Sequence, residues 1–423
     1  STLPEEQAPS LTSRLLISNQ ELSEIAPAAL GKAIFWSEPG GIRAVRYDGA
    51  PLWPSGEYLN DDLVYESGGD LTSVPEFPLL GHGLRQISVD NGRLIALLGS
   101  QIAIEARREP RSLESRLVCL DIADGEGKLL WSHSPSEALP SAEWRFSGPP
   151  VMRHDRVYVP VRRARPINAV GVVCLDAHNG DKLWFEQVAG LLSEPPETYH
   201  VVCADGLTIA YERVFLGGDF GALACLDVRT GRIEWVRRDE PVPWRVPPRV
   251  PEAESAGRRP LCYRGRTFTI EQDDSTVMSV DAWTGAMLWR RTLPAKLTTL
   301  VDARHGFLYA VGDHLWALDL ETGAVLWRFG LDDVEGEFLG QAVLVGSTAA
   351  AVDTSASLLA CTHDELWQIN ALSGAPERRI PLRELYNLAG GRLIPLSNRL
   401  LLVTPHQLAM LEWVGLSALP PIH

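Results

Sequence analysis

The sequence predicts an all-β protein, an eight-bladed β-propeller of four-stranded antiparallel blades, and three observations point to this fold. A short phrase recurs along the chain, with an alternating apolar run, Asp, Thr or Asn, Gly and Trp in fixed order. Runs rich in β-branched and aromatic residues precede most copies. Successive copies are spaced so that each interval fits one small sheet, which is the signature of a repeat architecture.

The order of residues within the phrase is that of a strand, a tight turn and a second strand. Apolar residues at every second position before the Asp place one side of the first strand in a core. The Asp carboxylate can accept hydrogen bonds from the backbone of the turn, and Gly supplies the positive φ that a tight turn needs. The Trp gives the second strand a large apolar surface to bury. Each phrase is therefore expected to form the last hairpin of a blade.

Four copies keep the same spacing from Asp to Gly to Trp, at 172–184, 222–235, 277–289 and 315–327. The copy at 117–131 has a longer turn, and the copy at 43–53 has a shorter one. The copy at 365–379 carries Asn370 in place of Asp and Arg378 in place of Trp. The residues assigned to the structural repeat are Asp121, Trp131, Asp176, Gly180, Trp184, Asp227, Gly231, Trp235, Asp281, Gly285, Trp289, Asp319, Gly323 and Trp327.

The phrases and a closing segment at 392–413 predict eight blades, with seven as the alternative. The last blade would lack a strand, and an N-terminal strand such as 32–36 would complete it and remove the open sheet edges. One propeller domain is expected at 30–415. A lead-in at 1–29, partly disordered or forming a short helix, would precede it, and a tail at 416–423 would follow.

The phrase resembles the tryptophan-docking motif of the PQQ-like β-propeller repeat family, which contains quinoprotein dehydrogenases and non-catalytic relatives. The copies at 222–235, 277–289 and 315–327 match this motif in full, and the copy at 172–184 has Asn179 in the Thr position. The resemblance implies that each Trp packs between adjacent blades and covers roughly residues 30–415. It is specific for the fold and much less so for function, because one fold hosts many kinds of site.

The two classes of this family imply different functions. Quinone-dependent dehydrogenases usually carry adjacent cysteines and a Glu, Asn and Asp set around calcium; this chain has no adjacent cysteines and no local motif for such a set. It is closer to the non-catalytic members, such as the outer-membrane assembly lipoprotein. No catalytic, cofactor-binding or metal-binding residue is assigned. No cofactor is expected, with pyrroloquinoline quinone and calcium as the alternative, so a scaffold is favoured over an enzyme.

Composition and charge argue against other classes of partner. The 54 Asp and Glu residues exceed the 39 Lys and Arg residues, giving a net charge of −15 that repels the phosphates of nucleic acids. No run of about 18 apolar residues occurs, so no membrane span is expected. Cys119, Cys174 and Cys225 hold one strand position in successive blades, too far apart for a disulfide, and are predicted core residues.

Three basic insertions form the candidate partner-binding surface. They lie at 105–116, 161–166 and 236–260, and the last is long and Pro-rich, so it is expected to be extended and exposed. Arginine and aromatic residues are common anchors at protein interfaces. The alternative is a set of solvated loops with local Arg–Glu pairs. The candidate partner-binding residues are Arg107, Arg108, Arg162, Arg163, Arg165, Trp244 and Arg245.

The sequence therefore predicts a monomeric, non-catalytic ring that binds a protein partner or another domain of its own precursor. The resemblance implies the bacterial periplasm or cell envelope, while free thiols fit a reducing compartment such as the cytoplasm equally well. Two alternative functions stay open. One is a PQQ-dependent dehydrogenase, and the other is a ligand-sensing domain of a larger receptor or kinase.

Overall fold

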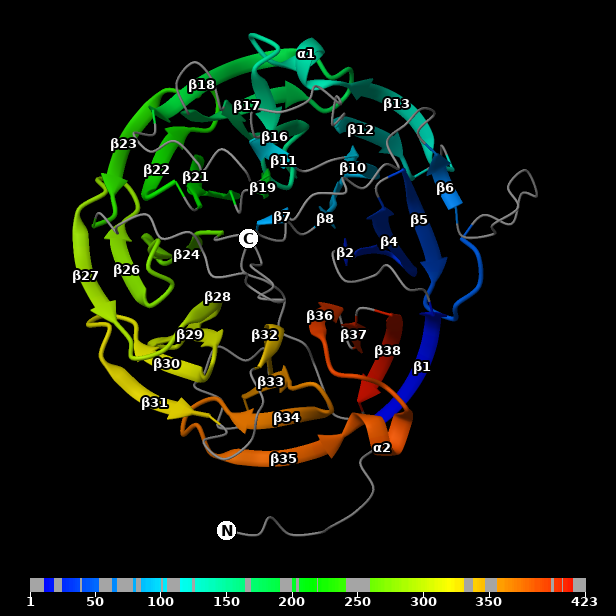
Figure 1. Cartoon of the computed structure of the whole chain (residues 1–423), viewed down its shortest axis with the longest axis vertical. Coiled ribbons are helices and arrows are strands. Elements are labelled where there is room, and N and C mark those ends of the chain that lie inside the picture. Colours follow the sequence, from blue (N-terminus) through cyan, green and yellow to red (C-terminus); the bar gives the residue numbers. More distant parts are fainter. Residues whose placement is uncertain are drawn as a thin grey trace.

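The chain folds into a ring of eight blades arranged around a central axis (Figure 1). This computed structural model describes residues 11–18, 25–38, 40–52, 63–66, 79–80, 85–99, 102–104, 115–123, 126–163, 169–190, 200–202, 205–218, 220–240, 259–330, 338–346, 356–396, 399–404 and 406–413. Each blade is an antiparallel sheet with four strand positions. The predicted fold class is confirmed, and the alternative of seven blades is wrong.

The blades are numbered in chain order, and the strands of each are given from the inner to the outer one. Blade 1 consists of β3 (Ala28–Leu30), β4 (Ala33–Glu38), β5 (Gly41–Arg46) and β6 (Leu63–Glu66), and blade 2 of β9 (Ser88–Asp90), β10 (Arg93–Gly99), β12 (Ser115–Asp121) and β13 (Lys128–His133). Blade 3 consists of β14 (Trp144–Phe146) with β15 (Val151–Arg153), β16 (Arg156–Arg163), β17 (Ala169–Asp176) and β18 (Lys182–Gly190). Blade 4 consists of β20 (Gly206–Ala210), β21 (Arg213–Gly217), β22 (Ala222–Asp227) and β23 (Ile233–Arg238).

Blades 5 to 8 follow the same plan. Blade 5 consists of β24 (Leu261–Tyr263), β25 (Arg266–Ile270), β26 (Thr276–Asp281) and β27 (Met287–Thr292), and blade 6 of β28 (Leu297–Arg304), β29 (Phe307–Gly312), β30 (Leu315–Asp319) and β31 (Val325–Phe329). Blade 7 consists of β32 (Leu339–Val345), β33 (Ser357–Cys361), β34 (Glu365–Asn370) and β35 (Pro376–Pro381). Blade 8 consists of β36 (Arg392–Leu396), β37 (Arg399–Val403), β38 (Gln407–Trp413) and β1 (Leu11–Ser18).

A few short elements lie outside this plan. They are the helices α1 (Pro135–Ala138) and α2 (Leu382–Tyr386), the parallel pair β2 (Ile25–Ala26) and β8 (Arg85–Gln86), and a small sheet of β7 (Leu79–Leu80), β11 (Ile102–Ile104) and β19 (His200–Val202). The first strand of blade 3 is split, and β14 and β15 pair with opposite ends of β16. Within the described segments, no helix has the length and apolar character needed to cross a bilayer.

The strand β1 closes the ring by pairing antiparallel with β38 as the outer strand of blade 8. An N-terminal strand therefore completes the last blade, but the choice of 32–36 was wrong, because Ala33–Glu38 is the second strand of blade 1. The short helix expected within 1–29 is also wrong for Leu11–Ser18. Pairing with the otherwise open edge of β38 outweighs the weak local helical spacing of this segment.

The apolar core lies between neighbouring blades. One cluster combines Phe268 of blade 5 with Leu308 and Leu318 of blade 6, and another combines Tyr309 of blade 6 with Ile369 of blade 7. The second and third strands of the blades are therefore almost fully buried, as in β26, where every residue from Thr276 to Val280 is buried. Burial on both sides holds each blade at a fixed place in the ring and so fixes the positions of its connecting loops.

The repeat turns are held by the side chain that begins them. Asp227 accepts hydrogen bonds through Oδ1 from the Thr230 backbone N–H at 2.7 Å and the Thr230 hydroxyl at 2.6 Å. Gly231 then takes a φ of +74°, in the left-handed region that favours glycine. In blade 7, Asn370 accepts the same two bonds from Ser373, so the substituted copy keeps the turn.

The hydrogen bonds from Thr230 hold the pKa of Asp227 below its ordinary value. This carboxylate therefore stabilises the fold above its unfolded pKa of about 3.9, and the stabilisation is lost as the pH falls through the lower folded pKa. We expect Thr230→Ala to raise the pKa of Asp227, as followed by NMR titration of the carboxyl carbon. Thr322→Ala, which acts on Asp319 in blade 6, is the matched control and should leave Asp227 unchanged. An unaltered Asp227 pKa in Thr230→Ala would contradict this account.

Candidate functional site

The connections between strands define two faces of the ring. The turn face carries the repeat turns and the hairpins between first and second strands, and the loop face carries the other connections. The three basic insertions lie between β10 and β12, between β16 and β17, and between β23 and β24. All three therefore connect strand ends at the loop face, so this face is the candidate functional site.

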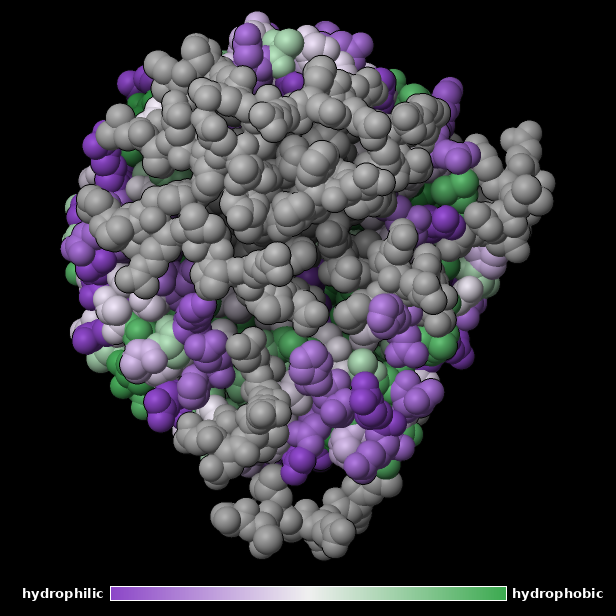
Figure 2. Space-filling model, in the orientation of Figure 1, coloured by the Kyte–Doolittle hydropathy of each residue, from purple (hydrophilic) through white to green (hydrophobic). Residues whose placement is uncertain are grey.

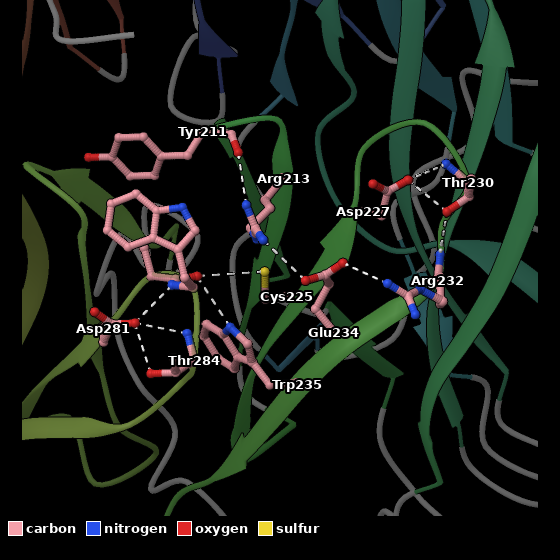
Figure 3. A network of polar contacts seen from close by, with 12 residues as sticks. Tyr211, Arg213, Cys225, Asp227, Thr230, Arg232, Glu234, Trp235, Asp281 and Thr284 are labelled. Atoms are coloured by element: carbon pink, nitrogen blue, oxygen red, sulfur yellow. Dashed lines mark hydrogen bonds and ion pairs between the residues drawn. The ribbon is translucent and has the colours of Figure 1, made fainter.

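On the turn face, the repeat residues of blades 4 and 5 form a continuous polar network (Figure 3). Arg213 donates hydrogen bonds to the Tyr211 carbonyl oxygen at 3.2 Å and to Glu234 at 3.1 Å. Glu234 also accepts a bond from Arg232, whose backbone N–H contacts the Thr230 hydroxyl. The network links β21 to β23 and the repeat turn, so it is a structural brace for this blade.

The tryptophans of the repeat lie between adjacent blades. The indole Nε1 donates to a carbonyl oxygen in the repeat turn of the next blade, in pairs that measure 3.0 Å for Trp131–Ala177, 3.2 Å for Trp235–Ala282, 3.0 Å for Trp289–Leu320 and 3.0 Å for Trp327–Ala371. The same rings cover the turn glycine of that blade so closely that a Cβ there would meet the ring, in the pairs Gly180–Trp131, Gly231–Trp184, Gly285–Trp235, Gly323–Trp289 and Gly374–Trp327.

Trp184 departs from this pattern. Its ring covers Gly231, but its buried Nε1 has no hydrogen-bond partner among the described residues. The carbonyl oxygen of Val228, which corresponds to Ala177, instead accepts a bond from the Tyr158 hydroxyl at 3.2 Å. The remaining turn residues cap their turns, since Asp121 accepts from the Ala123 N–H, Asp176 from the His178 N–H, Asp281 from Thr284 and Asp319 from Thr322.

Of the seven candidate partner-binding residues, only Arg162 and Arg163 lie within the described part of the chain. Arg107, Arg108, Arg165, Trp244 and Arg245 lie outside the described residues. The expectation of an exposed side chain is wrong for Arg162, which is buried at 3% exposure. Sequence reasoning placed it in an exposed basic run, whereas it occupies the buried end of β16.

Arg162 forms a buried ion pair with Asp205, which is fully buried. Its Nε and Nη2 atoms donate to the two carboxylate oxygens at 2.7 and 2.6 Å, and the Ser147 hydroxyl donates to Oδ2 at 2.7 Å. Gly218 allows this arrangement, because a Cβ there would lie 2.4 Å from Oδ1 of Asp205. Two charges in a dry interior are stable only when paired and hydrogen-bonded in this way. The pair joins blade 3 to blade 4 beneath the loop face.

Arg163, the next residue, has a different environment at the loop face. Its guanidinium lies 5.0 Å from the ring centre of Trp144, and its Nη2 atom lies 3.4 Å from Oε1 of Gln187. Trp144 is buried and makes an edge contact with Phe185. A cation held over an aromatic ring is oriented without being removed from solvent. Arg163 is therefore the candidate residue that the described structure presents at this face.

A second buried pair at the loop face was not found from the sequence. Glu271, 2% exposed at the end of β25, accepts two hydrogen bonds from Arg290, at 2.6 and 2.7 Å. Arg290 also contacts the exposed Glu240 at 3.1 Å. Neither residue belongs to the repeat phrase, and they are nineteen positions apart. The only sequence pattern that marks Glu271 is a charged residue directly after the apolar run of the second strand of its blade. This pattern is recognised only once the structure is known.

The five described cysteines are buried and unpaired with one another. Burial raises the pKa of the thiols of Cys119, Cys174, Cys225, Cys262 and Cys361 to about 12. The thiolate is the reactive form, so these groups are poor nucleophiles. Cys119, Cys174 and Cys225 are core residues as predicted, with zero exposure. Cys203 lies outside the described residues.

We expect these five cysteines to resist alkylation in the folded protein. At a pH near the ordinary thiol pKa of about 8.5, iodoacetamide should modify none of them before unfolding and all of them afterwards. Peptide mass spectrometry after brief exposure, with a urea-unfolded sample as the control, would measure this. Rapid native modification of Cys225 or Cys262 would contradict the burial seen in blades 4 and 5.

Two observations bear on the alternative of a quinone and calcium site. Within the described segments, no group of three or more His, Cys, Asp or Glu side chains is arranged to hold a metal ion. The two most deeply buried carboxylates at the loop face, Asp205 and Glu271, are already neutralised by Arg162 and Arg290. A calcium ion would have to displace these arginines to gain oxygen ligands.

Comparison with known proteins places these features in context. The sequence profile described as "Outer membrane protein assembly factor BamB" matches residues 39–238 and 237–385. A protein with that description from Alkalilimnicola ehrlichii is 29% identical over 199 residues, covering 44% of this chain and 48% of that protein. The match therefore spans about half the length of that relative.

Two solved structures show the same fold. BamB from Moraxella catarrhalis has a TM-score of 0.57 at 15% identity, covering 95% of this chain and 100% of that one. A quinohemoprotein alcohol dehydrogenase from Pseudomonas putida has a TM-score of 0.59 at 10% identity, covering 98% of this chain and 78% of that one. Because both scaffold and enzyme structures match at such low identity, this likeness shows the fold alone.

Proposed function

This chain belongs to the family of the outer membrane protein assembly factor BamB, and from that premise we propose that it is a non-catalytic scaffold of outer-membrane assembly. It would bind a protein partner through its loop face. The observation that carries the proposal is the profile match over residues 39–385, which covers the two outer strands of blade 1 and all of blades 2 to 7. The match to the family therefore extends over most of the ring and is not limited to one segment.

The loop face is suited to rigid recognition. The buried pair of Arg162 and Asp205 ties blades 3 and 4 together, and the pair of Glu271 and Arg290 braces blade 5. These pairs fix the strand ends at this face, and preorganised groups lose little freedom on binding. Arg163 over Trp144 supplies an oriented cation at this face. Arg107, Arg108, Arg165, Trp244 and Arg245 remain proposed partner-binding residues on the insertions of the same face.

The compartment follows from the same premise. We place the chain in the bacterial cell envelope, on its periplasmic side, because its family is named for outer-membrane assembly. Buried thiols with raised pKa values are compatible with an oxidising compartment, since they are poorly accessible to disulfide exchange. The ring is proposed to act as a monomer, and no nucleic-acid partner is proposed for a chain of net charge −15.

Affinity capture tests the proposal. The purified chain, immobilised, is incubated with detergent-solubilised envelope extract, and bound proteins are identified by mass spectrometry. We expect components of outer-membrane protein assembly to be retained. The double variant Arg163→Glu and Arg165→Glu should reduce their recovery several-fold, because reversing charge at an interface both removes contacts and adds repulsion. Arg162 is left intact, since its replacement would disturb the fold.

A matched charge reversal on the turn face provides the control. Arg229 and Arg264 are exposed there, and Arg229→Glu with Arg264→Glu changes net charge by the same amount. This control should retain the captured proteins. Equal recovery by the loop-face variant and the wild type would overturn the assignment of the face, and retention of no assembly component would overturn the function.

We also propose that the chain works without a quinone. The neutralised carboxylates Asp205 and Glu271 support this, because they offer no free oxygen ligands for calcium. Calorimetric titration with pyrroloquinoline quinone and calcium should give no binding heat. Saturable binding, with dye reduction on adding alcohols or aldoses, would instead favour the dehydrogenase function.

A further inference from the structure

Exposed apolar side chains gather on the outer strands of three neighbouring blades. Of twelve large hydrophobic side chains that are strongly exposed in the described residues, half belong to β23, β27, β31 or the turn before β27. They are Val236, Trp283, Met287, Leu288, Val325 and Leu326, with exposures of 42 to 49%. We call this group, together with Arg238, Arg291 and Arg328, the rim patch. The strands β23, β27 and β31 lie on the circumference of the ring (Figure 1), and the patch reaches the loop face at Val236 and Arg238, where the third basic insertion begins.

The same three strands are basic in an acidic protein. They contain five arginines and one glutamate, whereas the whole chain has a net charge of −15. Glu234 is paired with Arg213 and Arg232, and Arg290 is neutralised by Glu271 and Glu240. The charge of the patch therefore rests on the exposed Arg238, Arg291 and Arg328.

The packing of the tryptophans shows which arginines of the patch face a neighbouring blade. Residues two apart on a regular strand share a side, and Trp289 and Arg291 both contact the repeat turn of blade 6, through Leu320 and Gly323. Trp327 faces blade 7, whereas Arg328 pairs with Trp316 and therefore faces blade 5.

Arg291 on blade 5 and Arg328 on blade 6 therefore lie on the facing sides of the two blades, where Arg328 covers the ring of Trp316. Figure 2 shows both apolar and polar side chains at the edge of the ring where these blades lie. The arrangement is of the kind found at interfacial surfaces, with aliphatic groups interleaved with long cationic side chains whose stems are themselves apolar.

We propose that the rim patch binds an anionic phospholipid surface. Arginines contribute electrostatic attraction to acidic headgroups, and Met, Leu, Val and Trp side chains insert at the boundary between headgroups and acyl chains. A flat bilayer touches a ring edge-on over only a few adjacent blades, and on the outer strands of blades 4 to 6 the exposed apolar side chains occur together with exposed arginines. This contact adjoins the loop face at Arg238 but does not depend on the partner of that face.

An acidic polypeptide is the competing occupant, and the composition of the patch argues against it. Energetically dominant residues at protein interfaces are Trp, Tyr and Arg, whereas Leu and Val are under-represented. Four of the six apolar side chains in the patch are Leu or Val. Scattered aliphatic groups on a convex edge gain little from a rigid partner but insert readily into a fluid interface.

Vesicle sedimentation tests the proposal with the full chain. Vesicles of phosphatidylcholine alone are compared with vesicles of phosphatidylcholine and phosphatidylglycerol. We expect the chain to sediment with the phosphatidylglycerol vesicles only, and the bound fraction to fall as salt is added. Arg238→Gln with Arg328→Gln should reduce the partition coefficient by about tenfold or more. Leu288→Ser with Leu326→Ser should reduce it by a similar factor.

Blade 2 provides a matched control. Leu129 and Leu130 are exposed at 40 and 38% on its outer strand β13, which carries no arginine. Leu129→Ser with Leu130→Ser should leave vesicle binding unchanged, as should the loop-face variant Arg163→Glu with Arg165→Glu. Vesicle binding that is absent, insensitive to the patch variants or equally reduced in the control would overturn the proposal. So would salt-sensitive binding to an acidic peptide such as polyglutamate without any binding to vesicles.

Discussion

Replacing Arg162 with alanine is expected to lower the free energy of unfolding by about 3–5 kcal/mol, the cost of leaving a buried charge without its partner. Asp205 has zero exposure and would keep only the Ser147 hydroxyl as a side-chain partner among the bonds described above. The same substitution also removes the link between blades 3 and 4. Denaturant unfolding followed by tryptophan fluorescence would measure the loss, with far-UV circular dichroism to verify that the variant folds.

Two comparisons separate this charge effect from a general loss of packing. Arg163→Ala removes the neighbouring arginine, whose contact with Trp144 is partly exposed, and should cost about 1 kcal/mol or less. Arg162→Met combined with Asp205→Leu removes both charges and should be less damaging than Arg162→Ala alone. If the double variant were the least stable of the three, the ion pair itself would be the stabilising element.

The sequence predicted the features that are local and repeated. Asp227, Thr230 and Gly231 form the turn that their spacing indicated, because every contact of the turn lies within a few residues. Trp235, Trp289 and Trp327 lie between blades as the resemblance implied, since one indole position recurs at each copy. A local pattern that predicts little at one position predicts the fold when it recurs along the chain. The number of its copies then indicates the number of blades.

The sequence did not predict what depends on contacts between distant residues. The partner of Arg162 is forty-three residues away, in a segment without a repeat phrase, so a basic run looked like an exposed one. The strand β1 pairs with a strand at the other end of the chain, and local spacing cannot reveal such pairing. The rim patch likewise exists only because the ring brings three outer strands together.

Replacing Trp289 with alanine should cost about 3–5 kcal/mol, the range for removing a large buried aromatic side chain. Trp289 is 8% exposed, covers Gly323, lies 5.9 Å from the ring of Phe268 and donates a 3.0 Å hydrogen bond to Leu320. Its loss would leave a cavity between blades 5 and 6 and would remove one of the two hydrogen bonds that the Leu320 carbonyl oxygen accepts. Thermal and denaturant unfolding of the two proteins would give the difference.

Trp283 is the matched control, because it belongs to the same blade but is 49% exposed, and Trp283→Ala should cost about 1 kcal/mol or less. Gly323→Ala probes the contact from the other blade, since its Cβ would lie 2.5 Å from the Trp289 ring at a φ of +68°. If the Trp289 indole and Gly323 form one contact between the blades, the double variant Trp289→Ala with Gly323→Ala should lose less stability than the sum of the losses in the two single variants. Strict additivity, or equal costs for Trp283 and Trp289, would mean that the indole does not hold the two blades together.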